Sequence, residues 1–152
     1  KAGFIPRIID MARNTNNSMP SYELEILKSL LDKAGIEFLE SKIALLGVAY
    51  KKNVDDSRES PYYSIKKLLQ ENGVEFSVYD PWIKKENTCS TISEAIEECE
   101  AAILITDHDD IIYNLKLLDF TKTNLKVFID GRNALKKNDF PSSILYSGIG
   151  KK

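Results

Sequence analysis

Residues suited to bind an anionic ligand are concentrated in one polar stretch of the sequence. Tyr50, Lys51 and Lys52 follow the apolar run at residues 42–48. Lysine ammonium groups can meet a diphosphate as point charges, and a tyrosine ring offers a flat face to a ribose or a sugar. Two adjacent lysines are also typical of a solvated turn, and the residues alone leave both interpretations open.

Two arginines lie in comparable positions. Arg58 is surrounded by the acidic residues 55–56 and Glu59, so it is either an ion pair that stiffens its loop or an anion clamp held in place by those carboxylates. Arg132 follows Asp130 and a glycine at the end of an apolar run. A guanidinium there can bind a phosphate, a carboxylate or a sugar hydroxyl through two parallel bonds, or it forms a surface salt bridge with Asp130.

Residues for nucleophilic or metal chemistry are few. His108 is the only histidine, and no serine or cysteine nucleophile motif accompanies it, so we interpret it as a loop or helix-capping residue. Cys89 lies in a polar turn without a neighbouring base, and Cys99 is expected to be a buried thiol. The two cysteines have neither metal-ligand spacing nor a disulfide pattern, which fits a reduced, cytoplasmic protein. We therefore assign no catalytic and no metal-binding residue.

The overall charge and hydropathy narrow the class of protein. The formal net charge is -2 and the isoelectric point is near 5.5, whereas a general nucleic-acid-binding protein shows a basic excess. No stretch reaches the roughly 18 apolar residues needed to span a bilayer. We expect neither a nucleic-acid nor a membrane partner. Because the sequence begins at Lys1 without a methionine or a signal-peptide pattern, we interpret it as an excised part of a longer protein.

The first 40 residues are predicted to be helical. Apolar residues recur at helical spacing over residues 4–12 and again over 24–31, and the polar run 14–18 separates the two groups. Ser18 or Met19 is expected to cap a second helix that has Pro20 in its first turn. Gly35 is a natural helix stop.

From Ser41 onward short apolar runs alternate with helical patterns. A Ser60–Pro61 cap opens one helix, and others are expected at residues 91–100 and 109–115. This alternation predicts an α/β fold, a doubly wound, mainly parallel Rossmann-like sheet. Five strands are expected, at residues 42–48, 74–79, 101–106, 126–129 and 144–146.

The loop after the first predicted strand lacks a dinucleotide fingerprint. That motif needs Gly-x-Gly-x-x-Gly so that the backbone can approach a pyrophosphate. Here Gly47 is followed by the bulky Tyr50 and two lysines. We therefore expect that this domain does not bind NAD in the glycine-loop mode.

A family resemblance extends over essentially the whole chain. Residues 45–61 read LLGVAYKKNVDDSRESP, and they closely resemble the signature that opens the C-terminal domain of the UDP-glucose/GDP-mannose dehydrogenase family. Residues 78–81, 106–108, 129–133 and 148–150 resemble later family motifs in the expected order. The Asn-x-x-Met-Pro pattern at residues 16–20 is similar to the branch that acts on UDP-N-acetylhexosamines such as UDP-N-acetylmannosamine and UDP-N-acetylglucosamine.

The resemblance carries expectations for the site and for the whole protein. It implies an NAD-dependent oxidoreductase that oxidises C6 of a UDP-hexose or UDP-N-acetylhexosamine to the uronic acid for polysaccharide biosynthesis, through a cysteine-bound intermediate. It implies that Tyr50, Lys51 and Arg132 contact the UDP-sugar, and that Arg58 reaches an NAD held mainly by an N-terminal domain. Residues 1–40 would end the central dimerisation region of a homodimer, and residues 41–152 would form the UDP-sugar-binding domain.

The catalytic cysteine of the family, in its Gly-Phe-Gly-Gly-x-Cys setting, is absent from this sequence. The chain alone is therefore expected to be inactive and to keep at most a weak nucleotide-sugar site. Two alternatives share the fold. A receiver-type signalling module needs acids directly after the first strand and a lysine after the fifth, and both are missing. A noncatalytic interaction domain would scatter Lys51, Arg58 and Arg132 instead of bringing them to one cleft.

Overall fold

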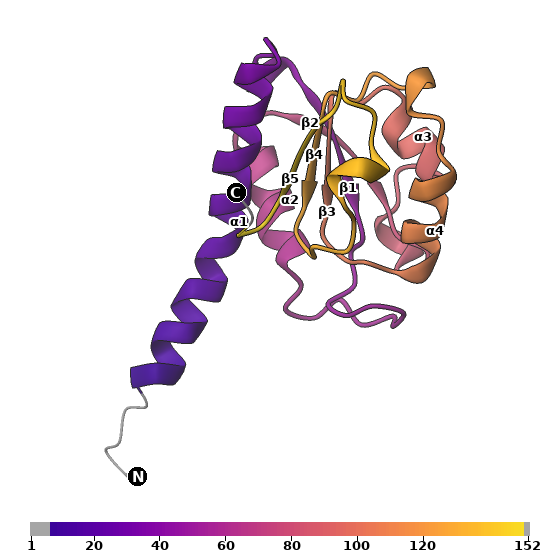
Figure 1. Ribbon diagram of the computed structural model, residues 1–152. Coiled ribbons are helices and arrows are strands. Elements are labelled where there is room, and N and C mark those ends of the chain that lie inside the picture. Colours follow the sequence, from indigo (N-terminus) through magenta and orange to yellow (C-terminus); the bar gives the residue numbers. More distant parts are fainter. Residues whose placement is uncertain (1–6, 151–152) are drawn as a thin grey trace, which may run out of the picture.

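The computed structural model describes residues 7–150, which contain one sheet of five parallel strands. Their spatial order is β2-β1-β3-β4-β5, and helices lie on both sides of the sheet (Figure 1). The strands are β1 (Lys42–Leu46), β2 (Glu75–Tyr79), β3 (Ala101–Leu104), β4 (Val127–Asp130) and β5 (Leu145–Gly148). The predicted doubly wound α/β fold is confirmed, and each strand lies close to its predicted position.

The helices divide between the two faces of the sheet. They are α1 (Arg7–Lys33), α2 (Pro61–Glu71), α3 (Ile92–Glu97) and α4 (Asp109–Leu117), with short 3-10 turns η1 (Phe38–Glu40), η2 (Lys84–Glu86), η3 (Phe120–Lys122) and η4 (Lys137–Asp139). Apolar side chains of α1 and α2 pack together on one face. Those of α3 and α4 pack on the other.

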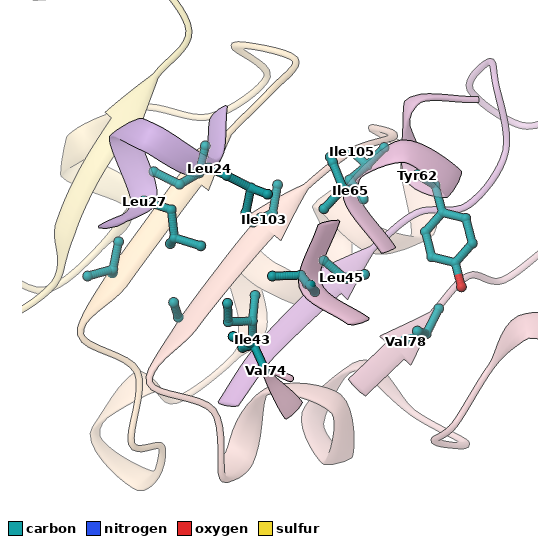
Figure 2. Close-up of a cluster of buried hydrophobic side chains, with 14 of the residues drawn as sticks. Leu24, Leu27, Ile43, Leu45, Tyr62, Ile65, Val74, Val78, Ile103 and Ile105 are labelled. Atoms are coloured by element: carbon teal, nitrogen blue, oxygen red, sulfur yellow. The ribbon is translucent and has the colours of Figure 1, made fainter. Parts of the chain in front are cut away.

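The central strands are buried on both faces, which explains their continuous apolar sequence. Successive side chains of a strand point to opposite faces. In β1, Ile43 and Leu45 accordingly join the cluster formed with α1 and α2, while Ala44 and Leu46 join the cluster formed with α3 and α4. Figure 2 shows the first cluster, in which Leu24 of α1 lies against the sheet with the strand residues.

The segment before the sheet is one continuous helix, so the prediction of two helices is wrong. The polar residues 14–18 do not interrupt it, and the hydroxyl groups of Thr15 and Ser18 bond to carbonyls of the same helix. Thr15 Oγ1 donates to the Met11 carbonyl at 3.0 Å, and Ser18 Oγ donates to the Thr15 carbonyl at 2.8 Å. Ser18 therefore does not cap a new helix, and Pro20 lies inside α1.

Only the C-terminal half of α1 packs on the sheet, while the N-terminal half extends away from it (Figure 1). Ile8, Ile9 and Met11 are exposed there. The predicted start of this helix at Phe4 lies outside the described residues. Among residues 7–150, no helix combines the length and the apolar character that crossing a membrane requires.

The strand order creates a switch point beside β1. The chain runs from β1 to β2 at one edge of the sheet and then returns to β3 on the other side of β1. Ligands of doubly wound sheets bind outside the carboxyl ends of the strands at such a point. The segments in that place are the loop after β1, residues 47–60, and the segment after β3, residues 105–108.

Candidate functional site

The loop after β1 contains a cavity of about 510 Å³ that is open to solvent. Two sequence motifs fix the ends of this loop. Gly47 begins it with φ +92°, a value that favours glycine. Ser60 ends it as the cap of α2, since its Oγ accepts a hydrogen bond from the Tyr62 amide. The cavity is lined by Tyr50, Lys51, Val54, Asp56, Arg58 and Glu59.

The structure distinguishes the two adjacent lysines. Lys52 Nζ lies 2.6 Å from Asp109 Oδ1 at the start of α4, so its charge is paired. Lys51 Nζ lies 5.8 Å from the centre of the Tyr50 ring, and within residues 7–150 it forms no ion pair. The Lys51 ammonium group therefore has no salt-bridge partner among these residues, and its charge contributes to lowering the pKa of Asp56 in the same cavity.

Arg58 forms the ion pair that one interpretation of the sequence anticipated. Its Nε and Nη2 lie 2.9 and 2.7 Å from the two carboxylate oxygens of Asp56. These hydrogen bonds lower the pKa of Asp56 to about 2. The pair holds the guanidinium at the cavity wall, and a guanidinium has five N–H groups, of which this contact occupies two. An ion pair and an anion clamp are thus compatible here.

Arg132 is separate from this cavity. It follows β4, and β3 lies between β4 and β1. Its Nε lies 3.2 Å from Asp107 Oδ1 after β3, while its backbone N–H donates to Asp130 Oδ1. The alternative of a side-chain salt bridge with Asp130 is therefore wrong. The Asp130 carboxylate is fully buried and organises the turn instead. The cavity brings Tyr50, Lys51 and Arg58 together, but not Arg132.

Glu23 of α1 lies beside this turn and was not anticipated from the sequence. Its carboxylate is close to Gly131, because a Cβ placed on that glycine would be 3.1 Å from Glu23 Oε1. Burial raises the pKa of Glu23 from 4.5 to about 7, although Arg132 acts in the opposite direction. On a helix with an otherwise apolar inner face, one glutamate gives no sequence signal of burial.

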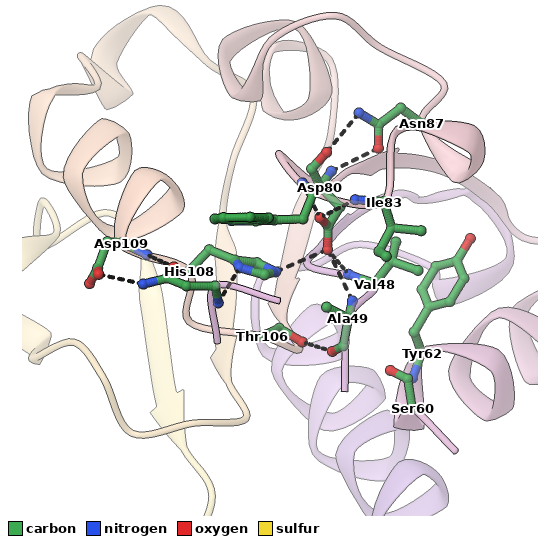
Figure 3. A network of polar contacts seen from close by, with 12 residues as sticks. Val48, Ala49, Ser60, Tyr62, Asp80, Ile83, Asn87, Thr106, His108 and Asp109 are labelled. Atoms are coloured by element: carbon green, nitrogen blue, oxygen red, sulfur yellow. Dashed lines mark hydrogen bonds and ion pairs between the residues drawn. The ribbon is translucent and has the colours of Figure 1, made fainter. Parts of the chain in front are cut away.

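A buried aspartate joins three loops at the carboxyl edge (Figure 3). Asp80, directly after β2, accepts hydrogen bonds from the amides of Val48 and Ala49 and from those of residues 82 and 83. It also contacts His108 Nε2 at 3.1 Å. Burial alone would raise the pKa of Asp80, but these donors outweigh burial and hold the pKa well below its usual range.

His108 is a loop residue, as expected, and its side chain is fully buried. It occupies the position before α4, yet its side chain caps no helix amide. Its Nδ1 instead accepts a hydrogen bond from the Asn53 amide at 2.9 Å. Of the two cysteines, Cys99 is buried as expected. Burial raises the pKa of Cys99 to about 11, so it is no nucleophile.

The geometry around Gly47 does not fit a dinucleotide fingerprint. In that motif the missing side chain lets a pyrophosphate approach the backbone. Here a Cβ on Gly47 would lie 2.6 Å from Thr106 N, so the neighbouring segment already fills the space. The acidic group that would bind a ribose, at the end of the second strand, is Asp80, and it is fully buried. The residues of this domain therefore do not form a glycine-loop NAD site.

Comparison with known proteins places this arrangement in a family. The model of the UDP-glucose/GDP-mannose dehydrogenase family, UDP binding domain, matches residues 44–137. The UDP-N-acetyl-D-mannosamine dehydrogenase of Methanococcus maripaludis (strain C7) is 37% identical over 137 residues, which is 87% of this chain and 31% of that protein. The UDP-glucose 6-dehydrogenase of Rhizobium meliloti is 30% identical over 138 residues, 82% of this chain and 30% of that protein.

A solved structure agrees with the sequence matches. The UDP-D-ManNAc dehydrogenase of Pyrococcus horikoshii superposes with a TM-score of 0.85 and 30% identity, over 99% of this chain and 35% of that chain. The chain thus spans about a third of the length of these relatives. By sequence and by fold, the chain belongs to the UDP-glucose/GDP-mannose dehydrogenase family and carries that family's UDP binding domain.

Proposed function

We propose that this chain binds the UDP part of a nucleotide sugar at the cavity in the loop after β1. The observation that carries the proposal is the state of Lys51. Its ammonium group lines the cavity and has no carboxylate partner within residues 7–150, whereas Lys52 is paired with Asp109. An unpaired lysine at the switch point of a doubly wound sheet is suited to bind a diphosphate. The family's UDP binding domain supports UDP as the nucleotide.

We expect each of the site residues to contact a different part of the ligand. Lys51 binds the diphosphate, and the half-exposed ring of Tyr50 packs against the ribose or the sugar. Arg132 reaches the sugar or its phosphate from the turn after β4, and it exchanges Asp107 for the ligand. Arg58 contacts NAD, as the family resemblance implies, and its side chain, which is 88% exposed, is accessible to a ligand.

The proposal extends to the whole protein through its relatives, which are dehydrogenases about three times as long as this chain. We propose a cytoplasmic, NAD-dependent 6-dehydrogenase that oxidises a UDP-hexose or UDP-N-acetylhexosamine to the uronic acid for polysaccharide biosynthesis. NAD would be held mainly by an N-terminal domain, which corresponds to a part of the relatives that this chain does not cover. Residues 1–40 would end the central region of a homodimer, and the exposed apolar residues 8, 9 and 11 of α1 support that role.

An alternative is a noncatalytic interaction domain that keeps the fold. The position of Arg132 outside the cavity favours this alternative, because three converging cations were the expected mark of a ligand site. Lys51 and Arg58 line one cavity, and this favours ligand binding.

Isothermal titration of the chain with UDP, a UDP-N-acetylhexosamine and NAD tests the proposal. The variants are Lys51→Ala and Arg132→Ala, with Lys52→Ala as the matched control of equal charge change. We expect the first two variants to weaken UDP binding by about tenfold, which corresponds to one charge-assisted contact, and Lys52→Ala to bind like the unchanged chain. Equal weakening by Lys51→Ala and Lys52→Ala, or no UDP binding by the folded chain, would contradict the proposal.

A further inference from the structure

The start of α4 holds the loop after β1 through a set of specific contacts (Figure 3). The Asn53 amide donates to His108 Nδ1 at 2.9 Å. The Asn53 side chain donates to Asp109 Oδ2 at 2.6 Å and accepts from the Asp109 amide at 3.1 Å. Lys52 Nζ contacts the other oxygen of the same carboxylate. Asn53 is therefore fixed by two consecutive residues of another segment, whereas the largely solvent-exposed ion pair between Lys52 and Asp109 contributes little.

A second anchor holds the same loop on the other side of Lys51. The Ala49 amide donates to Asp80, and the Ala49 carbonyl accepts a hydrogen bond from Thr106 Oγ1. Both partners are buried. The residues between the anchors are Tyr50, Lys51 and Lys52. The two proposed ligand-binding residues, Tyr50 and Lys51, thus lie on a short segment. One end of it is hydrogen-bonded to Thr106 and the other to His108.

We infer that His108 is a positioning residue, which sets the placement of Lys51 and Tyr50 for UDP by accepting the Asn53 amide. This inference rests on the proposed function. The contact matters because Asn53 has φ 57°, in the left-handed region that is unfavourable for most residues with a side chain. Without the Nδ1 acceptor the Asn53 amide would lose its hydrogen bond, and the loop would relax toward a commoner backbone conformation.

The hydrogen bonds assign the proton on the imidazole. Nδ1 accepts the Asn53 amide and so carries no hydrogen. In the neutral ring the hydrogen is then on Nε2, which donates it to Asp80 Oδ2. His108 therefore performs two separable tasks: one nitrogen orients the loop after β1, and the other satisfies the buried carboxylate after β2.

Two substitutions separate these tasks. In His108→Asn the amide oxygen can take the place of Nδ1 and accept the Asn53 amide, but no donor reaches Asp80. In His108→Gln the longer side chain can place its NH₂ group where Nε2 lies and donate to Asp80, but nothing accepts the Asn53 amide. A residue with a merely structural role would affect folding and binding in parallel in both variants, so a divergence between the variants is diagnostic.

The experiment measures two properties of the unchanged chain and of both variants. Hydrogen exchange of the Asn53 amide by NMR reports the contact itself, and titration with UDP reports its consequence. We expect His108→Gln to lose protection at Asn53 and to weaken UDP binding about tenfold. We expect His108→Asn to retain both within about twofold, although it unfolds at a lower denaturant concentration because the bond to Asp80 is lost.

The outcomes distinguish this inference from the proposed function. Equal UDP affinity in His108→Gln and the unchanged chain would overturn the role of His108 alone, and so would equal weakening in both variants. Absence of UDP binding by the unchanged chain, together with normal protection of Asn53, would overturn the proposed function and with it the purpose assigned to the contact. If His108→Gln does not fold, loss of UDP affinity in a folded His108→Asn still contradicts the inference, because that variant keeps the acceptor.

Discussion

The loop after β1 and the turn after β4 leave the same edge of the sheet in similar ways but are held differently. Each begins at a glycine that packs on a neighbouring segment, Gly47 on Thr106 and Gly131 on the Leu104 carbonyl. Each is organised by a buried aspartate. Within residues 7–150, the Asp130 carboxylate accepts hydrogen bonds from two amides of its own turn and from Tyr146 of β5. The loop after β1 depends on contacts from residues far along the chain, the nearest being Asp80.

This difference explains how the proposed ligand contacts can lie on a long exposed loop. The turn after β4 is short, and its buried aspartate bonds to backbone amides of the same turn, while the Arg132 side chain contacts Asp107 after β3. The loop after β1 is too long to be rigid by itself. Its support comes from Asp80, Thr106 and His108, which hold both sides of the segment that carries Lys51. The two regions should therefore respond differently to substitution.

The largest difference is expected at the two glycines. Gly47→Ala places a Cβ within 2.7 Å of backbone atoms of Thr106 at a left-handed φ of +92°, so both strain and overlap oppose it. Gly131→Ala meets one backbone atom at 2.8 Å without a left-handed φ. We expect losses in the free energy of unfolding of at least about 3 kcal/mol for Gly47→Ala and roughly 1–2 kcal/mol for Gly131→Ala. Urea unfolding measures both, and the reverse order would contradict the account.

The two buried aspartates come next. Asp80→Asn turns one oxygen of a five-donor site into a donor, whereas Asp130→Asn affects three donors. We expect Asp80→Asn to cost about 3 kcal/mol and Asp130→Asn about 2 kcal/mol. Only Asp80→Asn should also broaden the NMR signals of residues 47–53, since of the two aspartates only Asp80 bonds to that loop. Broadening in both variants would remove the distinction between the two regions.

Features set by neighbouring residues were predictable from the sequence, whereas contacts between distant residues were not. The five strands, the Ser60 cap and the stop at Gly35 depend on neighbouring residues, and the structure has them as predicted. The continuous α1 was missed because Ser18 bonds within its own helix, a choice that a capping residue's type does not reveal. The cluster of Asp80 and His108 joins residues from three loops. No local pattern indicates that contact, so His108 was interpreted only as a loop or helix-capping residue.

The buried carboxyl group of Glu23 should make the stability of the region after β4 depend on pH. Its pKa is raised from 4.5 to about 7 because it is buried, so the folded state binds its proton more tightly than the unfolded state. The contribution of this proton to the free energy of unfolding is fully present below pH 4.5 and is lost as pH rises through about 7. We expect a loss of up to about 3 kcal/mol over this window. Glu23→Gln should lack this loss in urea unfolding, and an unchanged pH profile would contradict the burial argument.

The smallest effect is expected at Tyr146. Its hydroxyl lies 2.9 Å from Asp130 Oδ2 and 2.8 Å from the Leu135 carbonyl, and it can donate its hydrogen to one of them at a time. Tyr146→Phe should therefore cost about 1 kcal/mol in the free energy of unfolding. It should leave the signals of residues 47–53 unchanged. A change in those signals would show that the turn after β4 and the loop after β1 are coupled.

The loop after β1 is the proposed nucleotide site of this chain, and amide NMR during titration with UDP identifies the residues that UDP contacts. We predict that the shifted signals are centred on residues 49–59, with further shifts at residues 131–133. Another cavity, of about 520 Å³, lies at the edge strand β2 and includes Asp80, Lys84 and Cys89. Shifts confined to that second cavity, with the loop after β1 unaffected, would contradict the account.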